Sequence, residues 1–265
     1  GWVPDGQHLF FTTREPERED RNTVLLDPET GEGQIVPNLP TSGTVWLNWS
    51  PDGSQFLWAA ANVLHVADAG NRDPKPVFNG NSDIAEPIWS PDSQQIAFVM
   101  QRQDAQSKEI YLIPVEGGDT NKITEFYTEQ PSHAPFSPEM LAWSPDGSRI
   151  AFILRSGYNE EISLCAVALV DQETTCLSEI PVRIDRSFAW LPDSQHLVLQ
   201  DGFEIYALDI CSGEVLNLTH DPAKDEIPYY TADQVISPDG RFLVFTSNRD
   251  HWKREAYVLH IASGE

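Results

Sequence analysis

Short apolar stretches recur along the chain, and each one follows the same turn phrase. The phrase occupies residues 2–6, 49–53, 89–93, 143–147, 190–194 and 236–240, and its fullest form is Trp-Ser-Pro-Asp-Gly. Pro favours the first central position of a type I turn, and Gly after Asp adopts the left-handed conformation that closes a hairpin with a bulge. The pattern therefore predicts two antiparallel strands joined at each phrase. Ser93 and Ser194 replace the Gly, which predicts two turns that are mildly strained or slightly different in type.

A second hairpin follows the first in most repeats. Residues 109–124 and 204–219 each contain alternating apolar residues, a Gly-bearing turn and a short strand that ends in Ile-Thr or Leu-Thr. Each repeat thus has four short strands in about 45 residues, which is the length of a β-propeller blade.

The predicted fold class is all-β, a six-bladed β-propeller of four-stranded antiparallel blades in a single domain, residues 1–265. The expected blades are residues 1–38, 39–80, 81–125, 126–180, 181–222 and 223–265. A blade of this size buries its two faces only against its neighbours. The competing all-β fold is a two-sheet sandwich, which has no need of six similar turn phrases. The sequence starts at the first phrase and stops after the sixth repeat's second turn, so we expect the first or last blade to be incomplete.

These motifs resemble the repeat of TolB-type six-bladed β-propellers. The resemblance rests on Trp-Ser-Pro-Asp-Gly-x-x-Ile-Ala-Phe, Glu-Ile-Tyr and the closing Leu-Thr, and it is most detailed over residues 218–250. Similar repeats occur in the propellers of prolyl-oligopeptidase-like enzymes. The resemblance implies a periplasmic or secreted bacterial protein that binds a protein or ligand at its channel mouth. The alternative is the propeller domain of a peptidase, separated from its hydrolase domain.

The net charge of the chain limits the kinds of molecule that it is expected to bind. The chain has 41 Asp and Glu against 17 Lys and Arg, a net charge of −24. Such a surface repels nucleic acids and anionic lipids. The sequence also contains no run of 18 apolar residues, the length that a helix needs to span a membrane. We therefore expect a protein partner, with a basic protein as one option, and neither nucleic-acid binding nor membrane insertion.

The aspartates of the six turn phrases form the most conspicuous acidic set. They are Asp5, Asp52, Asp92, Asp146, Asp193 and Asp239. Asp in a turn accepts hydrogen bonds from nearby backbone N–H groups, and one pocket could not use six equivalent turns. We assign these residues a structural role.

A second set precedes the first strand of several repeats, which lines the channel of a propeller. Its members are Asp83, Glu86, Glu129, His133, Asp185, Asp225 and Glu226. Three interpretations stay open: a solvated acidic surface, a rim that recognises a basic partner, or oxygen ligands for Ca²⁺. We expect no other cofactor.

Cysteine spacing suggests one disulfide. Aligning residues 165–178 with residues 206–219 places Cys165 opposite Cys176, within reach of an S–S bond at a non-hydrogen-bonded pair. Two reduced, packed thiols are the alternative, and Cys211 has no evident partner.

Motifs for catalysis are absent from the sequence. It contains no Gly-x-Ser-x-Gly, no His-Glu-x-x-His and no glycine-rich phosphate loop. We therefore expect no catalytic residues, and a binding module is favoured over an enzyme.

Overall fold

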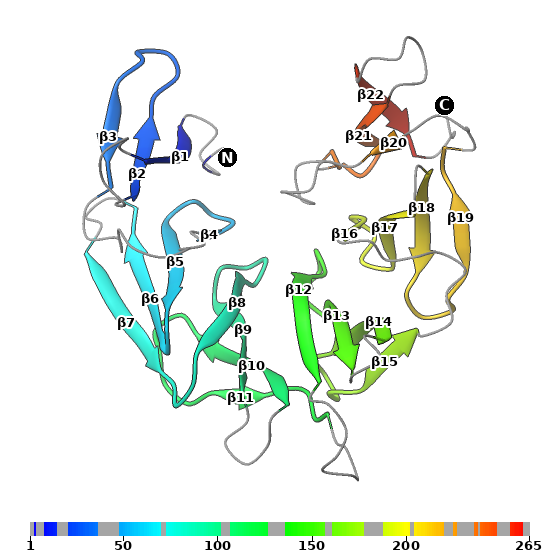
Figure 1. Cartoon of the computed structure of the whole chain (residues 1–265), viewed down its shortest axis with the longest axis horizontal. Helices are drawn as coiled ribbons and strands as arrows, with labels where there is room; N and C mark the ends of the chain where they lie inside the picture. The colour runs from blue at the N-terminus through cyan, green and yellow to red at the C-terminus, as the bar shows by residue number, and fades with distance from the viewer. Residues whose placement is uncertain are drawn as a thin grey trace. The chain divides into compact units, whose positions relative to one another are not determined.

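The structure is a computed structural model. It describes residues 3, 8–14, 21–36, 48–69, 73–101, 107–126, 136–156, 161–177, 188–201, 204–219, 225–226, 236–237, 239–247 and 255–261. The chain divides into two compact units, Gly1–Thr128 and Glu129–Glu265. Each unit is built from small antiparallel sheets of strands that are consecutive in sequence (Figure 1).

The first unit contains three sheets. Their strands are β1 (Leu9–Arg14), β2 (Arg21–Leu26) and β3 (Gly33–Ile35); β4 (Asn48–Trp49), β5 (Gln55–Ala60), β6 (Val63–Asp68) and β7 (Pro74–Asn79); and β8 (Ile84–Trp89), β9 (Gln95–Gln101), β10 (Lys108–Pro114) and β11 (Asn121–Lys122).

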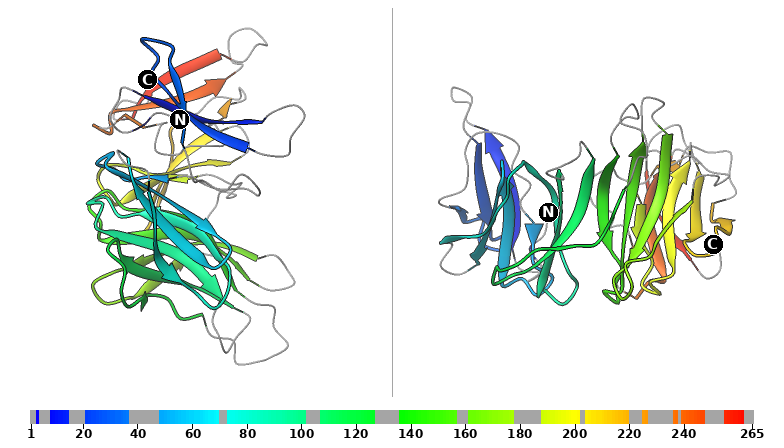
Figure 2. Two further views of the ribbon diagram at one scale, coloured as in Figure 1. Left: turned by 90° about the vertical axis from the view of Figure 1, so that its left-hand side faces the viewer. Right: turned by 90° about the horizontal axis from the view of Figure 1, so that it is seen from below.

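The second unit also contains three sheets. Their strands are β12 (Ser137–Trp143), β13 (Arg149–Ser156), β14 (Glu161–Ala168) and β15 (Thr174–Leu177); β16 (Phe188–Trp190), β17 (His196–Asp201), β18 (Glu204–Asp209) and β19 (Val215–Asn217); and β20 (Asp225–Glu226), β21 (Phe242–Ser247) and β22 (Glu255–His260). Two further views show the sheets as twisted layers (Figure 2).

The strand content agrees with the predicted class. The described residues contain no helix, and four of the sheets have four strands in sequential antiparallel order. In those residues the first and last sheets have three strands each.

A serine two residues before the phrase aspartate organises four of the described turns, and three of these serines, Ser50, Ser90 and Ser144, are buried. Ser144 Oγ accepts the N–H of Arg149 at 2.9 Å and donates to Asp146 Oδ1 at 2.7 Å. The same two bonds occur around Ser50, Ser90 and Ser237. In each of these turns the Asp Oδ1 also accepts the backbone N–H two residues later. The Ser–Asp pair thus satisfies the backbone donors that the tight turn leaves without strand partners.

The two serines that replace Gly lie in the same left-handed conformation as the glycines. Ser93 has φ 60° and Ser194 has φ 57°, against 71° for Gly53. Each serine is buried, and its Oγ accepts a backbone N–H from the turn of the preceding sheet in its unit. These bonds are Asp52 N–H to Ser93 Oγ at 3.3 Å and Asp146 N–H to Ser194 Oγ at 3.0 Å. The substitution therefore couples neighbouring sheets while keeping the turn.

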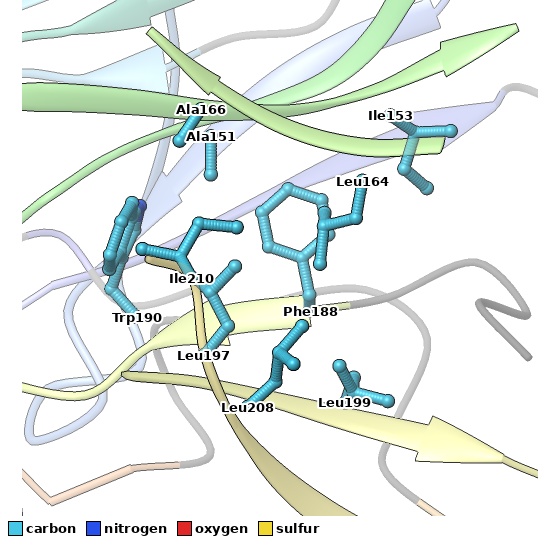
Figure 3. Packing of buried hydrophobic residues seen from close by; sticks show 10 residues of the cluster. All are labelled: Ala151, Ile153, Leu164, Ala166, Phe188, Trp190, Leu197, Leu199, Leu208 and Ile210. Atoms are coloured by element: carbon cyan, nitrogen blue, oxygen red, sulfur yellow. The ribbon is translucent and has the colours of Figure 1, made fainter. Parts of the chain in front are cut away.

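Apolar clusters fill the space between consecutive sheets within each unit. Figure 3 shows the cluster between sheets β12–β15 and β16–β19, which is formed by Ala151, Ile153, Leu164, Ala166, Phe188, Trp190, Leu197, Leu199, Leu208 and Ile210. The phrase tryptophan belongs to it, and Trp190 Nε1 donates to the carbonyl of Ala142 at 3.0 Å. Trp89 Nε1 makes the equivalent bond to the carbonyl of Asn48. Within each unit, consecutive sheets thus bury apolar side chains against each other, as neighbouring blades do.

A disulfide joins β14 to β15. Cys165 and Cys176 are directly opposite in the register, with Cα atoms 4.1 Å apart, close to the spacing of a non-hydrogen-bonded pair. Cys165 is buried and Cys176 is exposed, and Cys211 is a free, exposed thiol.

Candidate functional site

A β-bulge interrupts β8, the first strand of its sheet. Ala85 is opposite Val99 and Ile88 is opposite Ala97, so Glu86 and Pro87 together face one residue of β9. Glu86 has φ 52°, a left-handed conformation that is rare for a residue with a side chain. Bulges of this kind redirect a side chain and are common beside functional sites.

The same irregularity occurs in β12. Its register shifts between Glu139 and Ala142, and Met140 has φ 56°. Glu86 and Met140 both stand three residues before the phrase tryptophan. The bulge therefore occurs in the first strand of two described sheets, and the residue at its centre differs between them.

Two contacts from the preceding sheet hold the β8 bulge. Asn48 Nδ2 donates to the carbonyl of Pro87 at 2.7 Å, and the Asn48 carbonyl accepts Trp89 Nε1 at 3.0 Å. The equivalent residue before the phrase tryptophan is Ala142 in β12, which has no side-chain donor. The asparagine clamp is thus specific to the junction of β4 and β8.

A cavity of about 450 Å³ opens at this bulge. It is lined by Asn48, Ala59 and residues 84–88, and we call it the β8 pocket. Glu86, which is exposed, is the one charged residue among those seven. The remaining wall is largely apolar, and a cavity of this size falls in the usual range of ligand pockets.

The structure places four of the seven predicted rim residues. Asp83 is exposed and lies directly before β8, three residues from Glu86. Asp225 and Glu226 form β20, where they are opposite Ser247 and Thr246. Glu129, His133 and Asp185 lie outside the described residues.

Among the residues that the structure describes, no three His, Cys, Asp or Glu side chains gather as a metal-binding group. Ca²⁺ at the rim therefore stays a prediction.

No helix in the described part of the chain has the length and apolarity to cross a membrane.

The turn aspartates take part in backbone capping, and Asp5 lies outside the described residues. The hydrogen bond from Ser90 Oγ, with that from the Gln94 N–H, lowers the pKa of Asp92 below 3.8. Burial alone would raise the pKa of Asp146, but the bonds from Ser144 and Ser148 together lower it. These carboxylates are therefore ionised at neutral pH and engaged within their own turns.

Sequence reasoning selected Glu86 for its charge and its position before the phrase, and it missed the bulge and the pocket. The residue with positive φ is a Glu, whereas the residues that signal this backbone conformation in a sequence are Gly and Asn. The role of Asn48 was missed as well, because it depends on a contact between two sheets that are about 40 residues apart in sequence.

Comparison with known proteins identifies distant relatives of this chain. No known protein-family profile matches the chain. An uncharacterised peptidase, YuxL of Bacillus subtilis, is 25% identical over 211 residues, which are 76% of this chain and 29% of that protein. The Tol-Pal system protein TolB of Thioalkalivibrio sulfidiphilus is 33% identical over 64 residues, 24% of this chain and 14% of that protein. The chain thus spans less than a third of the length of either relative.

Solved structures show the fold. An oligogalacturonate lyase in complex with manganese matches 98% of this chain and 75% of its own, with a TM-score of 0.69 and 16% identity. A structure provisionally assigned as TolB from Agrobacterium tumefaciens matches 92% of this chain and 86% of its own, with a TM-score of 0.61 and 20% identity. These likenesses confirm the propeller prediction and exclude the two-sheet sandwich.

Proposed function

We propose that this TolB-like β-propeller, a distant relative of TolB proteins and of peptidase propeller domains, is a non-catalytic module that binds another protein outside the cytoplasm. The binding site in this proposal is the β8 pocket together with the adjacent Asp83.

The observation that carries the proposal is the pocket at the β8 bulge. The pocket lies on the first strand of its sheet, and its one charged residue, Glu86, is exposed, so a ligand can reach it. The pocket has an apolar wall and a single carboxylate, the composition of a recognition site in which one polar group fixes orientation. Nothing in such a lining supplies a nucleophile with an adjacent base.

The disulfide supports the location outside the cytoplasm. Structural disulfides persist in oxidising compartments and are rare in the cytosol, where thiols stay reduced. The bond between Cys165 and Cys176, with the relationship to TolB, favours export of this chain.

Site-specific photo-crosslinking in the intact host tests the function. A photoreactive amino acid replaces Asp83 at the pocket in one variant and replaces Val170 in the other. Val170 is 92% exposed on the turn after β14, in the second unit. We expect a crosslinked protein from position 83 and none from position 170. Equal products from both positions, or none from position 83, would contradict the proposal.

A second candidate function is that of a propeller domain within a larger peptidase. The match to YuxL favours it, because the alignment covers 76% of this chain but 29% of that peptidase. Sequencing the surrounding reading frame separates the two functions. A neighbouring hydrolase segment with Gly-x-Ser-x-Gly would favour the peptidase, and a frame without one would favour the binding module.

A further inference from the structure

The geometry points to a conformational device in the repeat: a pair of hydrogen bonds, which we call the phrase latch, joins two of the three sheets in each unit, and the third sheet opens on its own. The latched pairs are β4–β7 with β8–β11 and β12–β15 with β16–β19. The sheets without the latch are β1–β3 and β20–β22, the first and the last along the chain.

Each phrase latch consists of two hydrogen bonds between consecutive turn phrases. In the first unit, Ser93 Oγ accepts the Asp52 N–H at 3.3 Å, and Trp89 Nε1 donates to the Asn48 carbonyl at 3.0 Å. Ser93 and Trp89 are both buried, so water competes little for either bond. The later phrase thus holds the earlier one at two points that are four residues apart.

The second unit repeats the arrangement. Ser194 Oγ accepts the Asp146 N–H at 3.0 Å, and Trp190 Nε1 donates to the Ala142 carbonyl at 3.0 Å. The donors and acceptors occupy the same positions of the phrase as in the first unit. The phrase latch is therefore a device that the chain uses twice.

The phrases next to the terminal sheets lack the groups or the bonds of the latch. In the last sheet Ile236 replaces the tryptophan and Gly240 replaces the serine, so this phrase has neither an indole N–H nor a hydroxyl. In the phrase that follows β1–β3, Gly53 has no hydroxyl, and Trp49 Nε1 is buried without a hydrogen-bond partner among the described residues. Within the described part of each unit, the terminal sheet is therefore not latched to its neighbour.

Burial gives a second, independent argument. Among the residues of β1–β3 whose exposure the structure describes, Thr23 alone is buried, whereas β9 buries five consecutive residues, Ile96–Met100. In the last sheet the paired residues Val244 and Val258 are 42% and 61% exposed. Segments with few buried apolar contacts open at lower free energies than the packed core. Burial and hydrogen bonding thus both predict that the terminal sheets open before the latched pairs.

The β8 pocket lies within the first latched pair. Asn48 and Ala59 come from β4 and β5, and residues 84–88 come from β8. Opening of β1–β3 therefore leaves the pocket assembled, whereas loss of the phrase latch loosens its two walls.

Native-state hydrogen exchange of the whole chain tests the device. Mass spectrometry of peptic peptides measures exchange at increasing urea concentrations below the unfolding midpoint. We expect β4–β7 and β8–β11 to share one opening free energy, and β12–β15 and β16–β19 to share another. The amides of β1–β3 and β20–β22 should exchange about tenfold faster than those of the latched pair in the same unit.

Ser93→Ala removes the hydroxyl of the first latch and keeps a Cβ on the left-handed backbone. Ser54→Ala is the matched control, because the exposed Ser54 Oγ donates to Asp52 Oδ1 at 2.8 Å within its own sheet. After Ser93→Ala, β4–β7 has no complete latch to either neighbour in its unit. We expect its amides to exchange about fivefold faster than those of β8–β11, and Ser54→Ala to leave the two sheets coincident.

Two tryptophan substitutions test the second bond without altering a strained turn. Trp190→Phe removes the indole N–H that binds the Ala142 carbonyl and retains an aromatic ring. Trp143→Phe is the control in the same pair of sheets, because Trp143 Nε1 has no hydrogen-bond partner among the described residues. We expect Trp190→Phe to separate the opening of β12–β15 from that of β16–β19, and Trp143→Phe to leave them coincident.

Three results would overturn the inference: terminal sheets that exchange as slowly as the latched pairs, coincident exchange of β4–β7 and β8–β11 in Ser93→Ala, or equal effects of Trp190→Phe and Trp143→Phe. None of these measurements involves a binding partner. Failure of the crosslinking experiment at position 83 would therefore leave the phrase latch unaffected.

Discussion

Removing the buried hydroxyl of Ser144 tests how the turn phrase stabilises a sheet. In the wild type, Ser144 Oγ accepts the Arg149 N–H at 2.9 Å and donates to Asp146 Oδ1 at 2.7 Å, and the serine is fully buried. Ser144→Ala leaves the Arg149 N–H without that acceptor, and an unsatisfied buried donor costs about 1–3 kcal/mol. Asp146 loses the hydrogen bond from Ser144 but keeps the bond from the Ser148 N–H at 2.9 Å.

We expect Ser144→Ala to lower the free energy of unfolding by about 2 kcal/mol, which is about 30-fold in the unfolding equilibrium. Ser148→Ala is the matched control. Its hydroxyl also donates to Asp146, at 2.8 Å, but it is exposed and water replaces it. That variant should change the unfolding free energy by less than about 0.5 kcal/mol.

Urea titration followed by tryptophan fluorescence measures both variants, with the midpoint and slope determined separately. Amide hydrogen exchange at Arg149 gives a local measurement, because the N–H that loses its acceptor should exchange faster in Ser144→Ala. Equal destabilisation by the two substitutions, or unchanged exchange at Arg149, would refute the role assigned to the buried hydroxyl.

Three further predictions concern the glycines, one histidine and the cysteines. Gly240→Ala should lower the melting temperature more than Gly31→Ala. Both glycines have positive φ, but a Cβ at Gly240 would lie 2.8 Å from Pro192, whereas a Cβ at Gly31 would have nothing within 4 Å. Equal shifts in melting temperature would contradict this prediction. Burial lowers the pKa of His65 below 6.5, so stability present above pH 6.5 should fall as the pH drops below that value, and His65→Phe should remove this pH dependence of the urea midpoint. Maleimide labelling followed by intact mass measurement should modify Cys211 alone without reductant and all three cysteines after reduction and unfolding; three labels without reductant would refute the disulfide.

The local architecture was determined by the sequence. Pro, Asp and a residue that tolerates positive φ define each turn, and apolar residues at fixed distances from that turn define the strands on either side. Cys165 and Cys176 could be paired because antiparallel register within one hairpin depends on residue counting alone.

The tertiary structure decided what depends on contacts between sheets. The sequence alone indicates that Ser93 and Ser194 are imperfect substitutes for Gly. In the structure, each serine accepts a hydrogen bond from a backbone N–H of the preceding sheet. Glu86 reads as one carboxylate among 41 acidic residues, and only the bulge in β8 and the clamp from Asn48 place it at a pocket. The physical reason is range: turn chemistry acts over about five residues, whereas the pocket requires two strands from different sheets to meet.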